Sequence, residues 1–117
     1  MRVFVYFNLH KRVFSVKALE GENKGRVVAH RAYVALTDVV FKVSEAGRQR
    51  VIAEQRKNVH AGATGHWTDE SIALDDAVAV TYNPYKYSSF VVKSTEMPVR
   101  TAHRAVLHNK TIMAEIG

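Results

Sequence analysis

The feature that most constrains the fold is a succession of short apolar runs separated by polar turn segments. β-Branched and aromatic residues dominate these runs, which is typical of strands. The clearest pattern lies at the end of the chain, where Ile112, Ala114 and Ile116 alternate with other residue types, as expected for a strand with one buried face. Eight strands are predicted on this basis: residues 2–7, 12–19, 26–36, 39–43, 77–82, 87–93, 99–108 and 111–116.

One segment of the chain has helical character. Ser44 is a suitable N-cap, and Glu45 suits the positive end of the helix dipole. Residues 45–58 consist mainly of good helix formers and include several arginines. The order of strands, helix and strands predicts an α+β fold. We expect a single domain over residues 1–117, with a mostly antiparallel, curved sheet and one main basic helix.

Two stretches between these elements carry weaker signals. Residues 60–67 contain two glycines and other small side chains, which favours a loop or a short irregular strand. Residues 68–76 are acidic and fit a surface loop or one short helical turn. Their acidic side chains are Asp69, Glu70, Asp75 and Asp76.

The net charge of the chain indicates which class of molecule it attracts. Lys and Arg number 17 against 11 Asp and Glu, which gives a formal net charge of +6 and a sequence pI of about 9.8. A surface of this sign attracts polyanions, so we expect nucleic acid, acidic lipid or an acidic protein as the class of partner, and nucleic acid or an acidic host protein in particular.

Other chemistry is excluded by composition. The chain has no cysteine, which rules out disulfides, thiolate metal sites and a cysteine nucleophile. No apolar run approaches the roughly 20 residues that a membrane-spanning helix needs, and the N-terminal residues do not resemble a signal peptide. We therefore expect no membrane partner and a cytoplasmic location.

The predicted basic helix is the first candidate contact surface for nucleic acid. An arginine side chain can donate two parallel hydrogen bonds to a phosphate group. Arg48 falls on the apolar side of the helix, where burying a positive charge is costly unless the charge is paired. The alternative is an ordinary solvated helix face, with Glu54 neutralising its neighbours. The candidate phosphate contacts are Arg48, Arg50, Arg56 and Lys57 in the helix and Lys11 and Arg12 in the first hairpin turn.

An aromatic turn is the second candidate surface. Tyr85, Lys86 and Tyr87 follow an Asn-Pro turn signal. Tyrosines interleaved with a lysine on an exposed turn resemble a surface that binds a single strand or a protein. The alternative is that these are ordinary strand aromatics, since tyrosine is common in sheets.

Two histidines flank the glycine-containing stretch and are candidate catalytic residues. A metal-independent ribonuclease needs a general acid, a general base and a cation near the reacting phosphate. His60 and His66 could supply the first two, with a nearby arginine as the third. Neither histidine fits an established metal spacing, so neither a metal nor a cofactor is predicted.

Several short strings resemble small uncharacterised proteins encoded by tailed bacteriophages, over most of the chain. The resemblance implies a bacterial host cytoplasm and a host-takeover or counter-defence role, and it assigns no catalytic residue. The strings are residues 6–11 with 14–16, 56–61, and 83–87 with 89–91.

Taken together, these patterns favour a non-enzymatic binding protein that contacts nucleic acid or a nucleic-acid-associated host protein. A small metal-independent ribonuclease using His60 is one alternative. A virion or assembly protein with protein-only contacts is another. Strand edges in a β-rich chain can pair between subunits, so a homodimer is compatible with the pattern.

Overall fold

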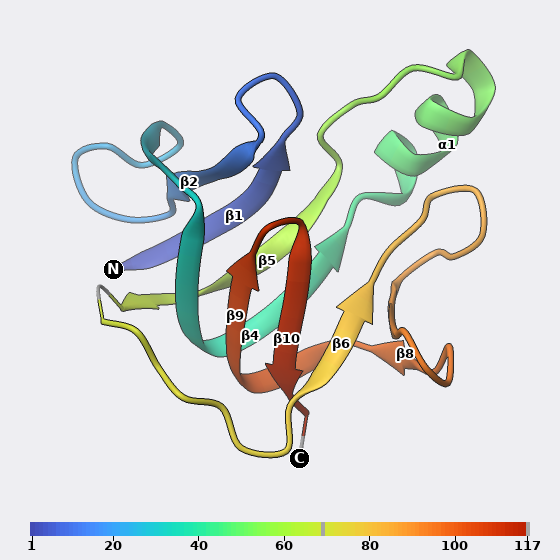
Figure 1. The fold of residues 1–117 in the computed structure, drawn as a ribbon. Coiled ribbons are helices and arrows are strands. Elements are labelled where there is room, and N and C mark those ends of the chain that lie inside the picture. The colour runs from blue at the N-terminus through green and yellow to red at the C-terminus, as the bar shows by residue number, and fades with distance from the viewer. Residues whose placement is uncertain (69, 117) are drawn as a thin grey trace.

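Over the residues that the structure describes, the fold is a curled antiparallel sheet with one short helix attached at its end (Figure 1). The computed structural model describes residues 1–68 and 70–116. In chain order its elements are β1 (Arg2–Asn8), β2 (Val13–Ala18), β3 (Val27–Arg31), β4 (Tyr33–Val43), α1 (Glu45–Glu54), β5 (Ala61–Thr68), β6 (Val78–Thr81), β7 (Phe90–Val92), β8 (Pro98–Val99), β9 (Thr101–His108) and β10 (Thr111–Glu115).

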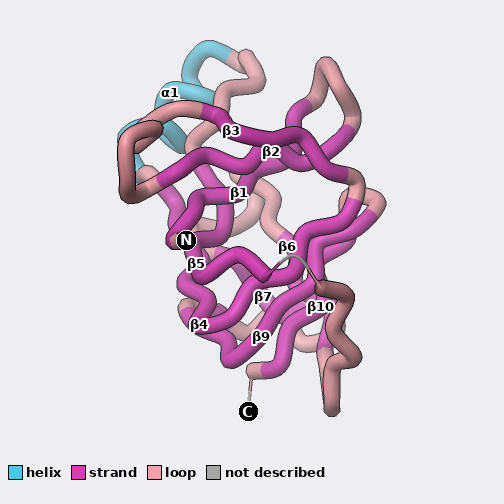
Figure 2. Tube along the Cα trace, turned by 90° about the vertical axis from the view of Figure 1, so that its left-hand side faces the viewer, coloured by secondary structure: helices cyan, strands magenta, loops and turns pink. Residues whose placement is uncertain are grey.

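Ten strands form the sheet, in the order β3-β2-β1-β5-β4-β9-β10-β6-β7-β8. Every neighbouring pair is antiparallel. The outermost strand β8 runs into the central strand β9 with only Arg100 between them. The second half of the sheet therefore curls back on itself like a small barrel (Figure 2). Curling of this kind encloses an apolar interior without a covering layer of helices.

A bulge interrupts the regular pairing of β4. Asp38 adopts a left-handed backbone conformation with φ of 50°, and the pairing of β4 with β5 shifts between Thr37 and Val40. The bulge changes the buried face of the strand, because Leu36 is buried before it and Val39 after it. Bulges bend a strand and increase its twist, so this one explains how a single strand serves both halves of the curled sheet.

The predicted α+β class is wrong, because the protein is mainly β. The one helix among the described residues, α1, has only ten residues and buries only Gly47 and Val51. Ser44 caps it as predicted, with its hydroxyl accepting from the Gly47 amide at 3.2 Å. The helix stops at Glu54, short of the predicted residue 58, because Gln55 turns left-handed at φ 53° and ends the ladder. Good helix formers thus continue in the sequence beyond the residue at which the helix ends.

The glycine-containing stretch 60–67, expected to be a loop or irregular strand, instead forms the regular central strand β5. Its two glycines allow the backbones of the neighbouring strands to pack closely. A Cβ at Gly62 would lie 2.4 Å from the Val5 carbonyl oxygen, and one at Gly65 would lie 2.8 Å from that of Thr37. Only glycine lets the neighbouring backbones approach this closely.

Two predicted strands also merge in the structure. Residues 26–36 and 39–43 were expected to be separated at 37–38, but the chain breaks instead at Ala32, between β3 and β4. Positions 37 and 38 lie inside β4, where they form the bulge. A bulge residue and a turn residue share the same local preferences, which is why the sequence pattern suggested an end.

Residues 70–76 of the acidic stretch lie outside the sheet as a loop, while Thr68 ends β5. Among its described residues, the Ile72 amide donates to the Tyr33 hydroxyl at 3.1 Å, and the Asp75 amide donates to Glu115 at 2.7 Å. Asp69, counted among the acidic residues of this stretch, lies outside the described residues. The only helix seen in ranges 1–68 and 70–116 is too short and too polar to cross a membrane.

Candidate nucleic-acid interface

The predicted contact residues come from three segments at one end of the molecule. These are the β1–β2 turn, helix α1 with the chain that follows it, and the loop between β6 and β7. All three lie toward the upper part of Figure 1, beyond the ends of β1, β4 and β6. The sequence separates them by tens of residues, and the sheet topology brings them to the same end.

Arg48 is a structural clamp between the helix and the β6–β7 loop. Its Nε donates to the carbonyl of Pro84 at 3.0 Å and to that of Tyr87 at 2.8 Å. Its Nη1 donates to Glu45 at 2.9 Å. The side chain is only 16% exposed, which explains a cation on the apolar side of the helix. The Nε–H and one Nη1–H of the guanidinium that was predicted to serve phosphate are therefore used within the protein.

His60 supports the same junction. Its Nδ1 donates to the carbonyl of Asn58 at 2.8 Å, because a carbonyl can only accept. In the neutral ring, Nε2 then accepts from the Tyr82 hydroxyl at 2.7 Å. Burial raises the pKa of Tyr82, so this hydroxyl remains a donor. The first helical turn packs closely here, since a Cβ on Gly47 would lie 2.5 Å from the His60 Cβ.

The remaining cations of the helix segment point into solvent. Arg50, Arg56 and Lys57 are all exposed, as are Lys11 and Arg12 in the β1–β2 turn. Within the described ranges, none of the five has a carboxylate within 4.0 Å. They are consequently available to an outside anion, and they form the group we call the basic end.

The two tyrosines of the aromatic turn differ, because one is exposed and the other is hydrogen-bonded. Tyr85 is 59% exposed, whereas the Tyr87 hydroxyl donates to Glu96. That hydrogen bond raises the pKa of Tyr87. Lys86 lies 3.8 Å from the same carboxylate, so it is partly neutralised. Of the three predicted contact residues here, Tyr85 is the one presented outward and unengaged through its side chain in the described structure.

The structure does not bring His60 and His66 together. They lie six residues apart along an extended segment, a separation of roughly 20 Å at about 3.3 Å per residue. His66 is exposed on β5, while both ring nitrogens of His60 have partners. An acid–base pair acting on one phosphate needs groups a few ångströms apart, so this pair of histidines has no common site.

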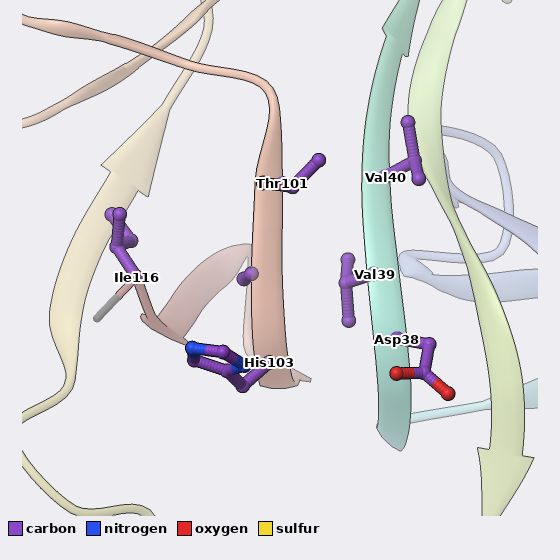
Figure 3. A pocket seen from close by; sticks show the side chains of 7 residues that line it. Asp38, Val39, Val40, Thr101, His103 and Ile116 are labelled. Carbon is purple, nitrogen blue, oxygen red and sulfur yellow. The ribbon is translucent and has the colours of Figure 1, made fainter.

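Residues that the sequence analysis did not select line two surface hollows. The smaller, of 290 Å³, lies beside the β4 bulge with Asp38 and His103 at its rim and Ile116 in its wall (Figure 3). The larger, of 440 Å³, includes Lys42 and Arg100. Strand alternation predicts that Lys42 faces outward. The fold is needed to show that Arg100 lines the same hollow. Nowhere in the described ranges do three His, Asp or Glu side chains gather as metal ligands do.

Comparison with known proteins places the chain among phage proteins. A family model described as Mycobacterium phage L5 gene 82 protein matches residues 1–115. The Gene 82 protein of Mycobacterium phage L5 is 40% identical over 122 residues, covering 97% of this chain and 95% of that protein. No solved structure matches the chain. The predicted resemblance to phage proteins is thus confirmed, and the match spans both the sheet and the basic end.

Proposed function

Because the chain belongs to the Mycobacterium phage L5 gene 82 protein family, we propose that it is a phage-encoded binding protein that contacts nucleic acid inside the bacterial host. It acts without a catalytic centre, and its contact surface is the basic end. A host-takeover or counter-defence role fits a small nucleic-acid-binding protein made by a phage.

The observation that supports this proposal is the exposure of unpaired cations at one end of the molecule. Arg50, Arg56 and Lys57 have no acidic partner in the described structure, and the exposed Lys11 and Arg12 add charge at the same end. Unpaired exposed arginines and lysines are the groups that contact phosphates and release counterions on binding. The net charge of +6 adds a longer-range attraction.

A nucleic-acid-associated host protein is the second partner that these cations suit. An acidic protein surface would meet the same five side chains, but it would lack the regular row of phosphates. Affinity for nucleic acid falls linearly on a logarithmic salt scale, with a slope of about −0.9 for each duplex phosphate contacted. The salt slope and its change in variants therefore distinguish the two partners.

The ribonuclease alternative gains no geometric support. His60 serves the junction between α1 and Tyr82, and His66 lies at a distance from it on β5. A virion or assembly role needs protein contacts alone and leaves the unpaired cations without a purpose.

The test measures binding of a labelled oligonucleotide by fluorescence anisotropy at several salt concentrations. The variant carries Arg50→Ala, Arg56→Ala and Lys57→Ala together. Its control removes the same charge elsewhere, at the exposed residues Lys24, Arg26 and Lys93. We expect the first variant to bind weakly with a salt slope reduced by about 2–3, and the control to lose much less.

Two results would overturn the proposal. Absence of binding by the wild-type protein at low salt would show that nucleic acid is not the ligand. Equal losses in the two variants would show that only net charge matters and that the basic end is not the contact surface. Both variants change exposed side chains without recorded partners in the described ranges, so both are expected to fold.

A further inference from the structure

The turn that carries Tyr85 is braced on both sides. Asn83 accepts the Tyr85 amide on its side chain at 2.9 Å. Its carbonyl accepts the amides of Lys86 at 3.1 Å and Tyr87 at 2.8 Å. From the helix, Arg48 binds the carbonyls of Pro84 and Tyr87. The backbone of the turn is thus fixed by five hydrogen bonds, while the ring of Tyr85 remains 59% exposed.

Exposing an aromatic ring on a braced turn has no role in folding. The neighbouring aromatic side chain of Tyr82 stacks with Phe90, at 5.2 Å between ring centroids. Tyr85 has no aromatic partner among the described residues. A ring on a braced backbone costs less conformational entropy to cover with a ligand, because the backbone of the turn is already ordered. The turn therefore presents the Tyr85 ring from a fixed position, where a flat ligand can cover it.

Other apolar side chains lie exposed on the segments that carry the basic end. Leu9 in the β1–β2 turn is 52% exposed, and Val59 in the segment after α1 is 54% exposed. Purely electrostatic contact with a duplex backbone needs cations and not apolar surface. Cations beside exposed apolar groups instead suit a ligand with both phosphates and accessible base faces.

We infer that the ligand is a single-stranded nucleic acid and that one of its bases stacks on Tyr85. This inference rests on the proposed function. In a duplex each base face is covered by its neighbours, so a tyrosine on a turn cannot stack on it. In a single strand the bases can be splayed out onto aromatic side chains while cations follow the backbone. Arg48 holds the turn in place and is not itself a contact.

The experiment compares strands of one sequence, as single-stranded DNA, single-stranded RNA and duplex DNA, each with 2-aminopurine at a central position. Binding is followed by anisotropy, and stacking by quenching of the 2-aminopurine fluorescence. The variants are Tyr85→Ala and Tyr85→Phe. Met97→Ala is the control, because Met97 is 64% exposed on a different turn. The signal of Trp67 reports that each variant is folded.

We expect wild type to bind at least one of the single strands more tightly than the duplex and to quench its fluorescence. Tyr85→Ala should bind that strand about fivefold more weakly or worse and lose the quenching, because stacking on one base contributes at least that much. Tyr85→Phe should stay within about twofold of wild type, since it keeps the aromatic face. Met97→Ala should behave like wild type.

Several outcomes would overturn the inference. Unchanged affinity and quenching in Tyr85→Ala would show that no base stacks there. Equal affinity for duplex and single strand would show that base faces are not read. In either case, loss of binding in the Arg50, Arg56 and Lys57 variant would leave the proposed function standing. If wild type binds none of the strands but binds an acidic protein, both proposals fail.

Discussion

Replacing Arg48 by methionine should destabilise the protein by about 2–3 kcal/mol. Methionine keeps the apolar stem of the side chain and removes the hydrogen bonds, so packing changes little. Both carbonyls of the β6–β7 loop are bound by the same Nε, and we count them as one charged hydrogen bond of about 1.5–3 kcal/mol. The pair with Glu45 adds little, because the Glu45 side chain is 56% exposed and its charge is screened by solvent.

Urea denaturation of Arg48→Met and Arg50→Met measures this difference. Arg50 is exposed on the same helix, and its loss should cost less than about 0.5 kcal/mol. Arg48→Lys should fall between the two, because an ammonium group can still donate to a carbonyl. Amide exchange at Tyr87 should quicken in Arg48→Met as the turn loosens. Equal unfolding midpoints for Arg48→Met and Arg50→Met would refute the clamp.

Two further predictions concern the sheet. Gly62→Ala should cost about 3 kcal/mol or more by urea denaturation, because its Cβ would lie 2.4 Å from a β1 carbonyl oxygen. Gly25→Ala, where φ is +86° but nothing lies within 4 Å, should cost only about 1 kcal/mol, and equal losses would contradict the packing argument. The hydrogen bonds from Arg104 lower the pKa of Glu115 to about 2. Its contribution to stability is present above the unfolded value near 4.5 and is lost as pH falls toward about 2. Thermal melts of Glu115→Gln should therefore depend less on pH between 5 and 2.5 than those of wild type, and parallel curves would contradict this.

Features set by neighbouring residues could be predicted from the sequence. The predicted strands 99–108 and 111–116 leave only Asn109 and Lys110 between them, and both residues adopt positive φ, at 49° and 65°, as a type I′ turn requires. The predicted strands 2–7 and 12–19 likewise leave a short turn, and Asn8 closes the observed turn by accepting the amides of His10 and Lys11 at 3.0 Å. Turn chemistry acts over a few positions, so the sequence contains the whole of the information.

Features set by distant residues could not be predicted in this way. The glycines of β5 suggested a loop because the backbones that they pack against lie far earlier in the chain, at Val5 for Gly62 and at Thr37 for Gly65. The end of α1 at Gln55 carries no glycine signal. Arg48 was recognised as unusual, but its partners lie 36 and 39 positions away. Only the curled topology of the sheet brings them within hydrogen-bonding distance.

The arginines in and just after the short helix therefore have different roles, which depend on how deeply each is buried. Its half-buried residue Arg48 attaches the β6–β7 loop, and Gly47 admits the helix close to His60. Arg50, on another side of the helix, and Arg56, just beyond its last residue Glu54, have no such contacts in the described structure and stay solvated. A helix that adds so little to the core, with only Gly47 and Val51 buried, is stabilised chiefly by its cap and by the clamp. Loss of the clamp should thus weaken binding indirectly, by releasing Tyr85, while loss of the exposed arginines should weaken it directly at unchanged stability. Variants of Arg48 therefore test the stability of the fold, and variants of the exposed arginines test contact with the ligand.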